Sequence, residues 1–335
     1  MPVILLHGYF GFDNAGDEAI LAGSLGLLHA RAADWRPVVA SGNPTRTEAV
    51  HNVEAIRRSR LPSMLKALKK DDRFLLAGGG LLQDATSLRS VLAYLEPMRR
   101  AGHDRAAMWA VGVGPLSPAG RAMVRAFGAP ARSVLRDEAS LRALLDLGYP
   151  QDSLVLGADA AFTLPPHPKA VSRGEIGLAV RPDRRIDAVA LGLEVVAGAA
   201  KAGFNVRLLP FRPEEDGPVC EEIARRAGGQ ARLAELPRTP AEIPEALSDL
   251  TAIVAERLHA LILGSLASVP AICIAYDPKV ALHAAMLGAP VVAPDEVRDF
   301  VSGGRWGDGE DAGRRAEVLR SRATGAFEAL WSAIA

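Results

Sequence analysis

Short apolar segments alternate with amphipathic ones along the whole chain. In the first half, the apolar runs predict strands at 3–7, 37–41, 73–77, 107–112, 132–135 and 154–157, and the helical pattern predicts helices near 17–31, 62–70, 86–101, 118–127 and 138–147. In the second half we expect strands near 176–180, 205–210, 231–236, 251–255, 270–275 and 290–293, with helices near 187–202, 214–227, 241–249, 258–267, 279–287 and 312–334. Such alternation predicts βαβ units and parallel sheets.

One proline-rich segment, residues 163–174, interrupts this alternation. Its three prolines within four positions cannot continue a helix or a central strand, so we interpret it as a linker. The sequence then predicts a Rossmann-like domain over 1–165 and a second one over 174–310. A last helix over 311–335 could pack back on the first domain. Two such halves would enclose a cleft that faces the carboxyl ends of both sheets.

The amino-acid composition limits which ligands and partners we expect. Lys plus Arg equals Asp plus Glu at 39 each, so no nucleic-acid partner is expected. Two cysteines far apart in sequence argue against a disulfide framework, and no His, Asp and Glu cluster stands out, so we expect neither a metal nor a cofactor. Without a signal-like start or a long apolar run, a cytoplasmic protein is expected. The basic segments 57–60 and 66–70 could touch an anionic membrane or form a solvated helix face.

A polar, glycine-rich loop follows the first predicted strand. It carries Asp13, Asn14 and Asp17 among glycines 8, 11 and 16, and a helix starts near Asp17. Glycines let a backbone approach a ligand closely, so the loop suggests a ligand site at the carboxyl edge of the sheet. The spacing is not a dinucleotide fingerprint, and an N-capped turn without a ligand is the alternative.

Two further loops follow predicted strands in the first half. Gly78, Gly79 and Gly80 end one strand and precede Gln83 and Asp84, a combination suited to an anion or a polar ligand. Arg136 ends another strand. Its guanidinium could face the cleft or form a salt bridge with a neighbouring carboxylate, and the sequence leaves both open.

The second half places three basic residues after two predicted strands. Arg257 and His259 can converge only if one lies on the loop and the other in the first helical turn, as at a strand-to-helix junction. Lys279 falls in the first turn of the next helix, where it opposes the helix dipole unless an anion compensates it. Together they predict a cationic pocket for a ligand with a carboxylate and a phosphate. A capping His and a surface Arg are the alternative.

These motifs together resemble the polysaccharide pyruvyl transferases, and most of all the bacterial type that acts on secondary cell-wall polymer. The similarity spans about residues 3 to 295. It rests on the stretches Gly8–Leu21, Gly78–Asp84, Ser133–Asp137, Arg257–His259 and Tyr276–Lys279.

The resemblance implies a GT-B-like fold and transfer from phosphoenolpyruvate to a sugar, giving a 4,6-linked pyruvate ketal and phosphate. It implies N-acetylmannosamine on a lipid-linked precursor as the acceptor. His259 and Lys279 match donor-pocket positions, with Arg257 and Arg136 as co-ligands. His259 could transfer a proton and Asp13 or Asp17 could orient or deprotonate sugar hydroxyls. The remaining acceptor candidates are Asn14, Gly79, Gly80, Gln83 and Asp84.

Two other functions fit the same patterns. A GT-B glycosyltransferase using a nucleotide sugar shares the architecture, although no ribose-binding Glu is clear in the second domain. A non-catalytic module that binds a phosphorylated ligand or a glycan is the other. The combination of a His with candidate carboxylates argues against it.

Overall fold

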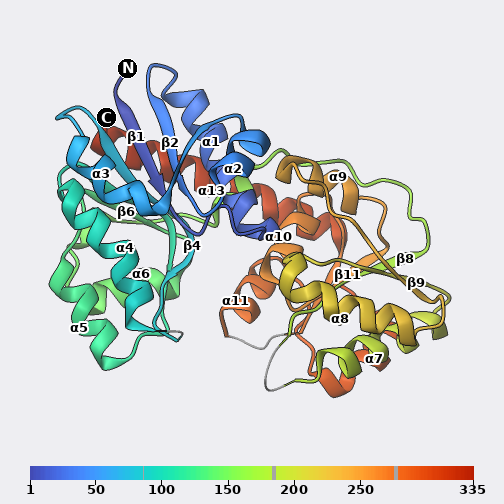
Figure 1. Cartoon of the computed structure of the whole chain (residues 1–335). Coiled ribbons are helices and arrows are strands. Elements are labelled where there is room, and N and C mark those ends of the chain that lie inside the picture. The colour runs from blue at the N-terminus through green and yellow to red at the C-terminus, as the bar shows by residue number, and fades with distance from the viewer. Residues whose placement is uncertain (86, 183–185, 275–277) are drawn as a thin grey trace. The chain divides into compact units, whose positions relative to one another are not determined.

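The computed structural model describes the whole chain except residues 86, 183–185 and 275–277 (Figure 1). The described residues form two compact units. The first contains Met1–Phe12, Asp17–Leu164 and Leu319–Ala335, and the second contains Asp13–Gly16 and Pro165–Val318. Each unit is built on one parallel sheet with helices packed on it, which confirms the α/β class predicted from the alternation.

The first unit has a seven-stranded sheet in the order β3-β2-β1-β4-β5-β6-β7. The strands are β1 (Val3–His7), β2 (Arg36–Ser41), β3 (Glu54–Arg57), β4 (Arg73–Leu82), β5 (Ala106–Val113), β6 (Arg132–Leu135) and β7 (Leu154–Leu156). The helices between them are α1 (Ala15–Arg31), α2 (Pro44–His51), α3 (Leu61–Ala67), α4 (Leu88–Ala101), α5 (Pro118–Phe127) and α6 (Glu138–Asp146). The direction of winding reverses between the central strands β1 and β4.

Alternation along β5 shows how the core of this unit divides into two layers. Met108 joins the apolar cluster formed with helices α3 to α6 on one face of the sheet. Its neighbour Trp109 points to the other face, as the period of a strand requires. There the indole N–H donates to Ser24 Oγ of α1 at 2.9 Å, and the ring packs edge-on against Phe327 with 5.0 Å between centroids.

Two elements of the first unit, α2 and β3, were not predicted. Helix α2 is mainly polar and buries only Thr47, so it has no apolar stripe to reveal it. Strand β3 is a four-residue edge strand with the charged residues Glu54 and Arg57 at its ends. Both elements depend on contact with β2 rather than on a periodic pattern of their own.

The second unit repeats the same winding in a five-stranded sheet of order β10-β9-β8-β11-β12. Its strands are β8 (Glu175–Ala179), β9 (Asn205–Leu208), β10 (Ala231–Leu233), β11 (Ala252–Ala255) and β12 (Ala271–Cys273). Its helices are α7 (Ala188–Lys201), α8 (Pro213–Arg226), α9 (Ile243–Leu247), α10 (Leu258–Ser265), α11 (Pro278–Met286) and α12 (Val297–Ser302). The strand predicted near 290–293 is reduced to a single bridge between Val291 and Cys273.

The last helix, α13 (Gly309–Ile334), starts in the second unit, and its residues from Leu319 onward belong to the first. In that part, Phe327 is fully buried and Trp331 packs edge-on against Trp35 with 5.1 Å between ring centroids. Within the described part of the chain, none of the helices is both long and apolar enough to cross a membrane.

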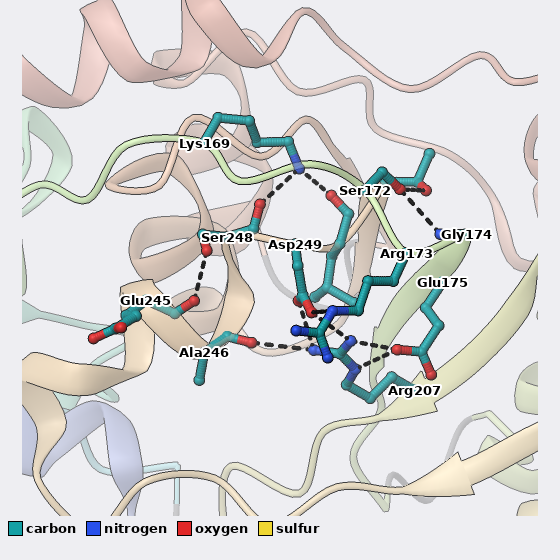
Figure 2. A network of polar contacts seen from close by, with 12 residues as sticks. Lys169, Ser172, Arg173, Gly174, Glu175, Arg207, Glu245, Ala246, Ser248 and Asp249 are labelled. Carbon is teal, nitrogen blue, oxygen red and sulfur yellow. Dashed lines mark hydrogen bonds and ion pairs between the residues drawn. The ribbon is translucent and has the colours of Figure 1, made fainter.

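An ion network in the second unit links the amino end of β8 to β9 and to the turn before β11 (Figure 2). Arg207 of β9 donates to Glu175 Oε2 at 3.0 Å and to Asp249 Oδ1 at 2.8 Å. Arg232 donates to Glu175 Oε1 at 2.6 Å. Hydrogen bonds from Arg232 and Arg207 lower the pKa of Glu175 to about 2, although burial opposes the shift. The carboxylates of this network, Glu175 and Asp249, lie at the amino end of β8 and just before β11, away from the carboxyl ends where the candidate site is expected, so we assign the network to the scaffold.

Candidate functional site

The strand order identifies where a ligand site is expected in each unit. In open parallel sheets, ligands bind beyond the carboxyl ends of the strands, where the winding direction reverses. That point lies between β1 and β4 in the first unit and between β8 and β11 in the second. The loops after β1, β4 and β11 hold most of the residues that the sequence singled out, so tertiary structure brings the motifs to the expected edges.

The loop after β1 is held by a buried carboxylate that the sequence did not single out. Glu18, in the first turn of α1, accepts the Gly11 N–H at Oε1 over 2.8 Å. Its other oxygen lies 2.8 Å from His51 Nε2 of α2. Both side chains are buried. The only sequence signal for Glu18 was its place beside Asp17, and His51 had none.

The tip of this loop, Asp13–Gly16, belongs to the second unit, although we expected it with the first domain. The reason is direct contact, since the Ala15 N–H donates to Phe211 O at 2.8 Å. Asp13 adopts a left-handed backbone with φ of 56°. Asn14 Oδ1 accepts the Gly16 N–H at 3.1 Å, which stabilises the start of α1.

Gly16 packs directly on the imidazole of His259. A Cβ at Gly16 would lie 2.1 Å from His259 Nδ1 and 2.4 Å from Cγ, so no side chain fits there. His259 is half-buried in the first turn of α10, which begins at Leu258 with Arg257 as its N-cap. The local geometry predicted for Arg257 and His259 is therefore confirmed. The tip of the β1 loop and the N-terminus of α10 therefore lie against each other and form one edge of the candidate site.

Arg257 is held by carboxylates of α8. Its Nε donates to Asp216 Oδ2 at 3.2 Å, its Nη2 also bonds to Asp216, and Glu215 lies 3.4 Å from Nη2. Asp216 is fully buried and also accepts the Arg212 N–H at 2.9 Å. Within the described part of the chain these bonds use Nε and Nη2, which leaves Nη1 as the edge of the guanidinium that can contact a ligand.

Lys279 lies in the first turn of α11, as predicted. Its side chain lies outside the described part of the structure, and so do residues 275–277 of the same motif.

The glycines after β4 are required by close contacts. Gly78 and Gly79 have φ of 63° and 76°, and β4 continues through them to Leu82. A Cβ at Gly78 would lie 2.0 Å from Ile20 Cγ2, and one at Gly79 would lie 3.1 Å from Asp17 Oδ1. The Asp17 carboxylate therefore lies against Gly79. Gly80 is exposed, and its Cβ position is 3.8 Å from Nη2 of Arg136.

Arg136 forms the salt bridge that the sequence left open. Its Nε lies 3.3 Å from Asp137 Oδ2 and its Nη1 lies 3.5 Å from Asp159 Oδ2. All three side chains are buried, and the guanidinium packs against Gly112, where a Cβ would lie 2.6 Å from Nε. This pairing holds the Arg136 guanidinium in a fixed place near Gly80.

Gln83 and Asp84 make local bonds that shape their loop. Gln83 Oε1 accepts the Ala85 N–H at 2.9 Å. Asp84 accepts from Ser117 twice, from N–H at 2.9 Å and from Oγ at 2.5 Å. The bonds from Ser117 lower the pKa of Asp84 and keep it ionised. Both residues thus tie the β4 loop to the start of α5.

An aromatic cluster that the sequence did not single out lies beside the β1 loop in the first unit. The rings of Tyr9 and Phe12 stack with 4.4 Å between centroids. The Arg58 guanidinium carbon lies 5.5 Å from the ring centroids of Phe12 and Tyr94. Burial, reinforced by the charge of Arg58, lowers the pKa of His7 to about 4 and keeps that imidazole neutral. Half-exposed stacked rings next to polar groups suit the apolar face of a sugar.

The two cysteines and the possible metal ligands are further candidates for reactive groups. Burial raises the pKa of Cys220 and of Cys273 to about 12, so both thiols stay protonated and unreactive. Among the residues that the structure describes, no group of three or more His, Cys, Asp and Glu side chains could hold a metal ion.

The fold is similar to that of nucleotide-sugar enzymes of low sequence identity. The UDP-GlcNAc 2-epimerase of Neisseria meningitidis, bound to UDP-GlcNAc, matches with a TM-score of 0.65 and 13% identity over 99% of this chain and 100% of that chain. Anabaena Alr3699/HepE in complex with UDP and glucose matches with a TM-score of 0.63 and 9% identity, over 98% of each chain. These likenesses show the GT-B-like fold of two Rossmann-like halves and nothing more specific.

Sequence comparison gives the family. No curated protein matches the chain significantly. A family model described as polysaccharide pyruvyl transferase matches residues 14–278. The matched range includes Asn14–Gly16 of the β1 loop tip, the β4 glycines, Arg136 and the Arg257–His259 pair, but neither Asp13 nor Lys279. Because this match covers most of the chain, the protein belongs to the polysaccharide pyruvyl transferase family and is an enzyme.

Proposed function

We propose that this enzyme transfers a pyruvyl group from phosphoenolpyruvate to a sugar of a lipid-linked cell-wall polysaccharide precursor. N-acetylmannosamine is the proposed sugar and a 4,6-linked ketal the proposed product. The observation that carries the proposal is the position of His259. It lies in the first turn of α10, at the carboxyl end of β11, against Gly16 of the motif loop. A proton-transfer group beside a helix N-terminus suits an anionic donor.

The donor side of the proposal uses His259, Arg257, Lys279 and Arg136. Phosphoenolpyruvate carries a carboxylate and a phosphate, and Arg257 Nη1 with the N-terminus of α10 could bind one of them. Lys279 is proposed as a point charge for the departing phosphate. Arg136 is paired with two buried carboxylates, so its contribution would be through its edge near Gly80.

In the proposed reaction, two sugar hydroxyl oxygens add to C2 of phosphoenolpyruvate and the bond from C2 to the phosphate oxygen breaks. One hydroxyl proton ends on the methylene carbon, which becomes a methyl group, and the other leaves with inorganic phosphate. His259 either protonates the methylene carbon or accepts a proton from a hydroxyl. No cofactor is needed, because phosphate is itself an adequate leaving group.

The acceptor side of the proposal uses Asp13, Asn14, Asp17 and the β4 loop. The Asp17 carboxylate lies against Gly79, and this supports the proposal that it contacts a ligand approaching the glycine backbone. The stacked rings of Tyr9 and Phe12 add a surface for a sugar ring. Gly80, Gln83 and Asp84 would shape the acceptor side through the loop bonded to Ser117.

A phosphate-release assay with phosphoenolpyruvate and a synthetic disaccharide acceptor tests the proposal. We expect acceptor-dependent phosphate release, and a fall of about 10²-fold or more in kcat for His259→Ala. Unchanged turnover of His259→Ala would remove the proton-transfer role. For Asp13→Ala we expect a higher KM for the acceptor. A higher KM for phosphoenolpyruvate with intact acceptor kinetics would contradict the assignment of Asp13.

The same assay separates the alternatives. Release of a nucleotide from a UDP-sugar, without phosphate release from phosphoenolpyruvate, would indicate a glycosyltransferase instead. Binding of phosphoenolpyruvate without turnover over the acceptor panel would indicate a binding module.

A further inference from the structure

Basic residues are concentrated in one stretch of the first unit. The whole chain has no net charge, yet residues 57–101 hold ten basic and four acidic side chains. We define the basic face as Arg57, Arg60, Lys66, Lys69 and Lys70, which are all exposed and lie on or next to α3. This excess is local, so it needs an explanation that general solubility does not provide.

The acidic residues of this stretch neutralise little of the positive charge of the basic face. Asp72 is buried, and its carboxylate accepts the N–H groups of Val3 and Lys69 at 2.7 Å each. Glu96 forms ion pairs with Arg99 and Arg100 of its own helix at 2.8 and 2.7 Å. Asp84 accepts from Ser117. Among the acidic side chains of residues 57–101, this leaves Asp71 as the exposed carboxylate beside the basic face.

A hollow with apolar and charged lining residues adjoins the basic face. A cavity of about 680 Å³ lies at the amino ends of β1 and β2, against the last turn of α3. Its apolar lining residues are Met1, Pro2, Val3, Met64, Ala67 and Leu68, and its charged lining residues are Arg36, Lys69, Asp71 and Asp72. Met1 is 79% exposed. Exposed apolar groups beside a cluster of lysines are typical of surfaces that lie in a membrane interface.

We propose that the basic face and this hollow dock the enzyme on an anionic lipid bilayer. The lysines and arginines would contact the lipid head groups, and Met1, Met64 and Leu68 would enter the interface. Charge complementarity favours an anionic bilayer over a neutral one, because each basic residue near such a surface strengthens binding by about fivefold.

This inference rests on the proposed function, because docking on a bilayer would bring the enzyme to an acceptor whose lipid is anchored there. Arg58, which stands between Arg57 and Arg60, contacts Phe12 of the aromatic cluster. Arg57 and Arg60 therefore lie at the carboxyl end of β3, on the same unit as the stacked rings, whereas the hollow lies at the amino ends of β1 and β2.

Vesicle cosedimentation tests the docking surface. We expect the full chain to bind vesicles containing about 30% phosphatidylglycerol and not vesicles of phosphatidylcholine alone. The variant Lys66→Glu/Lys69→Glu/Lys70→Glu should bind phosphatidylglycerol vesicles at least about a hundredfold more weakly. The matched control Lys201→Glu/Arg238→Glu/Arg322→Glu reverses three exposed basic residues outside this stretch and should bind like the unchanged chain.

Several outcomes would overturn the inference. These are no binding of the unchanged chain to either vesicle, equal binding to both, or an equal loss in the control variant. Self-association through the basic face, or retention by nucleic acid with no retention by vesicles, would also overturn it. Phosphate release with a soluble disaccharide should be unchanged in the triple lysine variant, so failure of docking and failure of the proposed reaction are seen separately.

Discussion

The contact between Gly16 and His259 allows a sharp test of the site. In Gly16→Ala the new methyl carbon would lie 2.1 Å from Nδ1, 2.4 Å from Cγ and 2.8 Å from Cε1 of the His259 ring. Ordinary van der Waals contact needs about 3.5 Å, so the imidazole or the helix start must move by roughly 1.4 Å. The substitution therefore displaces His259 without changing its chemistry.

The size of the effect follows from that displacement. A misplacement of about 1 Å in a catalytic group typically costs about 10²-fold in rate, or about 2.7 kcal/mol of transition-state stabilisation. We expect kcat/KM for phosphate release from phosphoenolpyruvate to fall by about that factor. The change should appear in kcat more than in the KM for the acceptor, because His259 is assigned to proton transfer.

Gly26→Ala is the matched control for this experiment. Gly26 lies on the same helix, α1, and a Cβ there would have no atom within 4 Å. The control should keep full activity and gain up to about 1 kcal/mol of stability, since Ala favours a helix over Gly. Activity of Gly16→Ala within threefold of the unchanged enzyme would refute the reasoning. An equal loss in Gly26→Ala would do so as well, because it would trace the effect to the helix rather than to His259.

Three further predictions concern stability, measured by urea unfolding. Arg207→Met should destabilise the second unit by about 3 kcal/mol at pH 7, because it leaves buried carboxylates short of a partner. The pKa of Glu175 is lowered from 4.5 to about 2, so the stability it contributes is present above pH 4.5 and lost as the pH falls toward 2. The gap between variant and parent should therefore narrow at pH 3, and a constant gap would contradict the assignment. Phe327→Ala should cost about 3–5 kcal/mol by opening a cavity beside Trp109, and a cost below about 1 kcal/mol would mean that α13 is not firmly packed. Ser24→Ala should cost about 1–3 kcal/mol, because it leaves the buried indole N–H of Trp109 without its acceptor, and an unchanged urea midpoint would show that the bond is dispensable.

Much of the fold and part of the site could be predicted from local pattern. The apolar run 3–7 matches β1, and the strand predicted at 132–135 matches β6, because strand and helix periods are properties of short segments. The same holds for the step from Arg257 on the loop to His259 in the first turn of α10. The family motifs were also recognisable, since they are contiguous stretches of sequence.

The pairing of charges could not be predicted, because it depends on which strands and helices are neighbours. Asp159 reaches Arg136 from 23 residues away, and Asp216 reaches Arg257 from 41 residues away. The sequence alone therefore left open whether either arginine was available to a ligand.

The β1 loop also shows which features the sequence determines and which features depend on tertiary contacts. The sequence by itself determined an α/β chain with glycines and carboxylates at strand ends, because glycine conformations and apolar runs act locally. Tertiary structure alone decided that Glu18 and His51 hold the loop and that Gly16 meets His259, more than 240 residues later. Those contacts require two distant segments to be packed together, and no local pattern encodes which segments will meet.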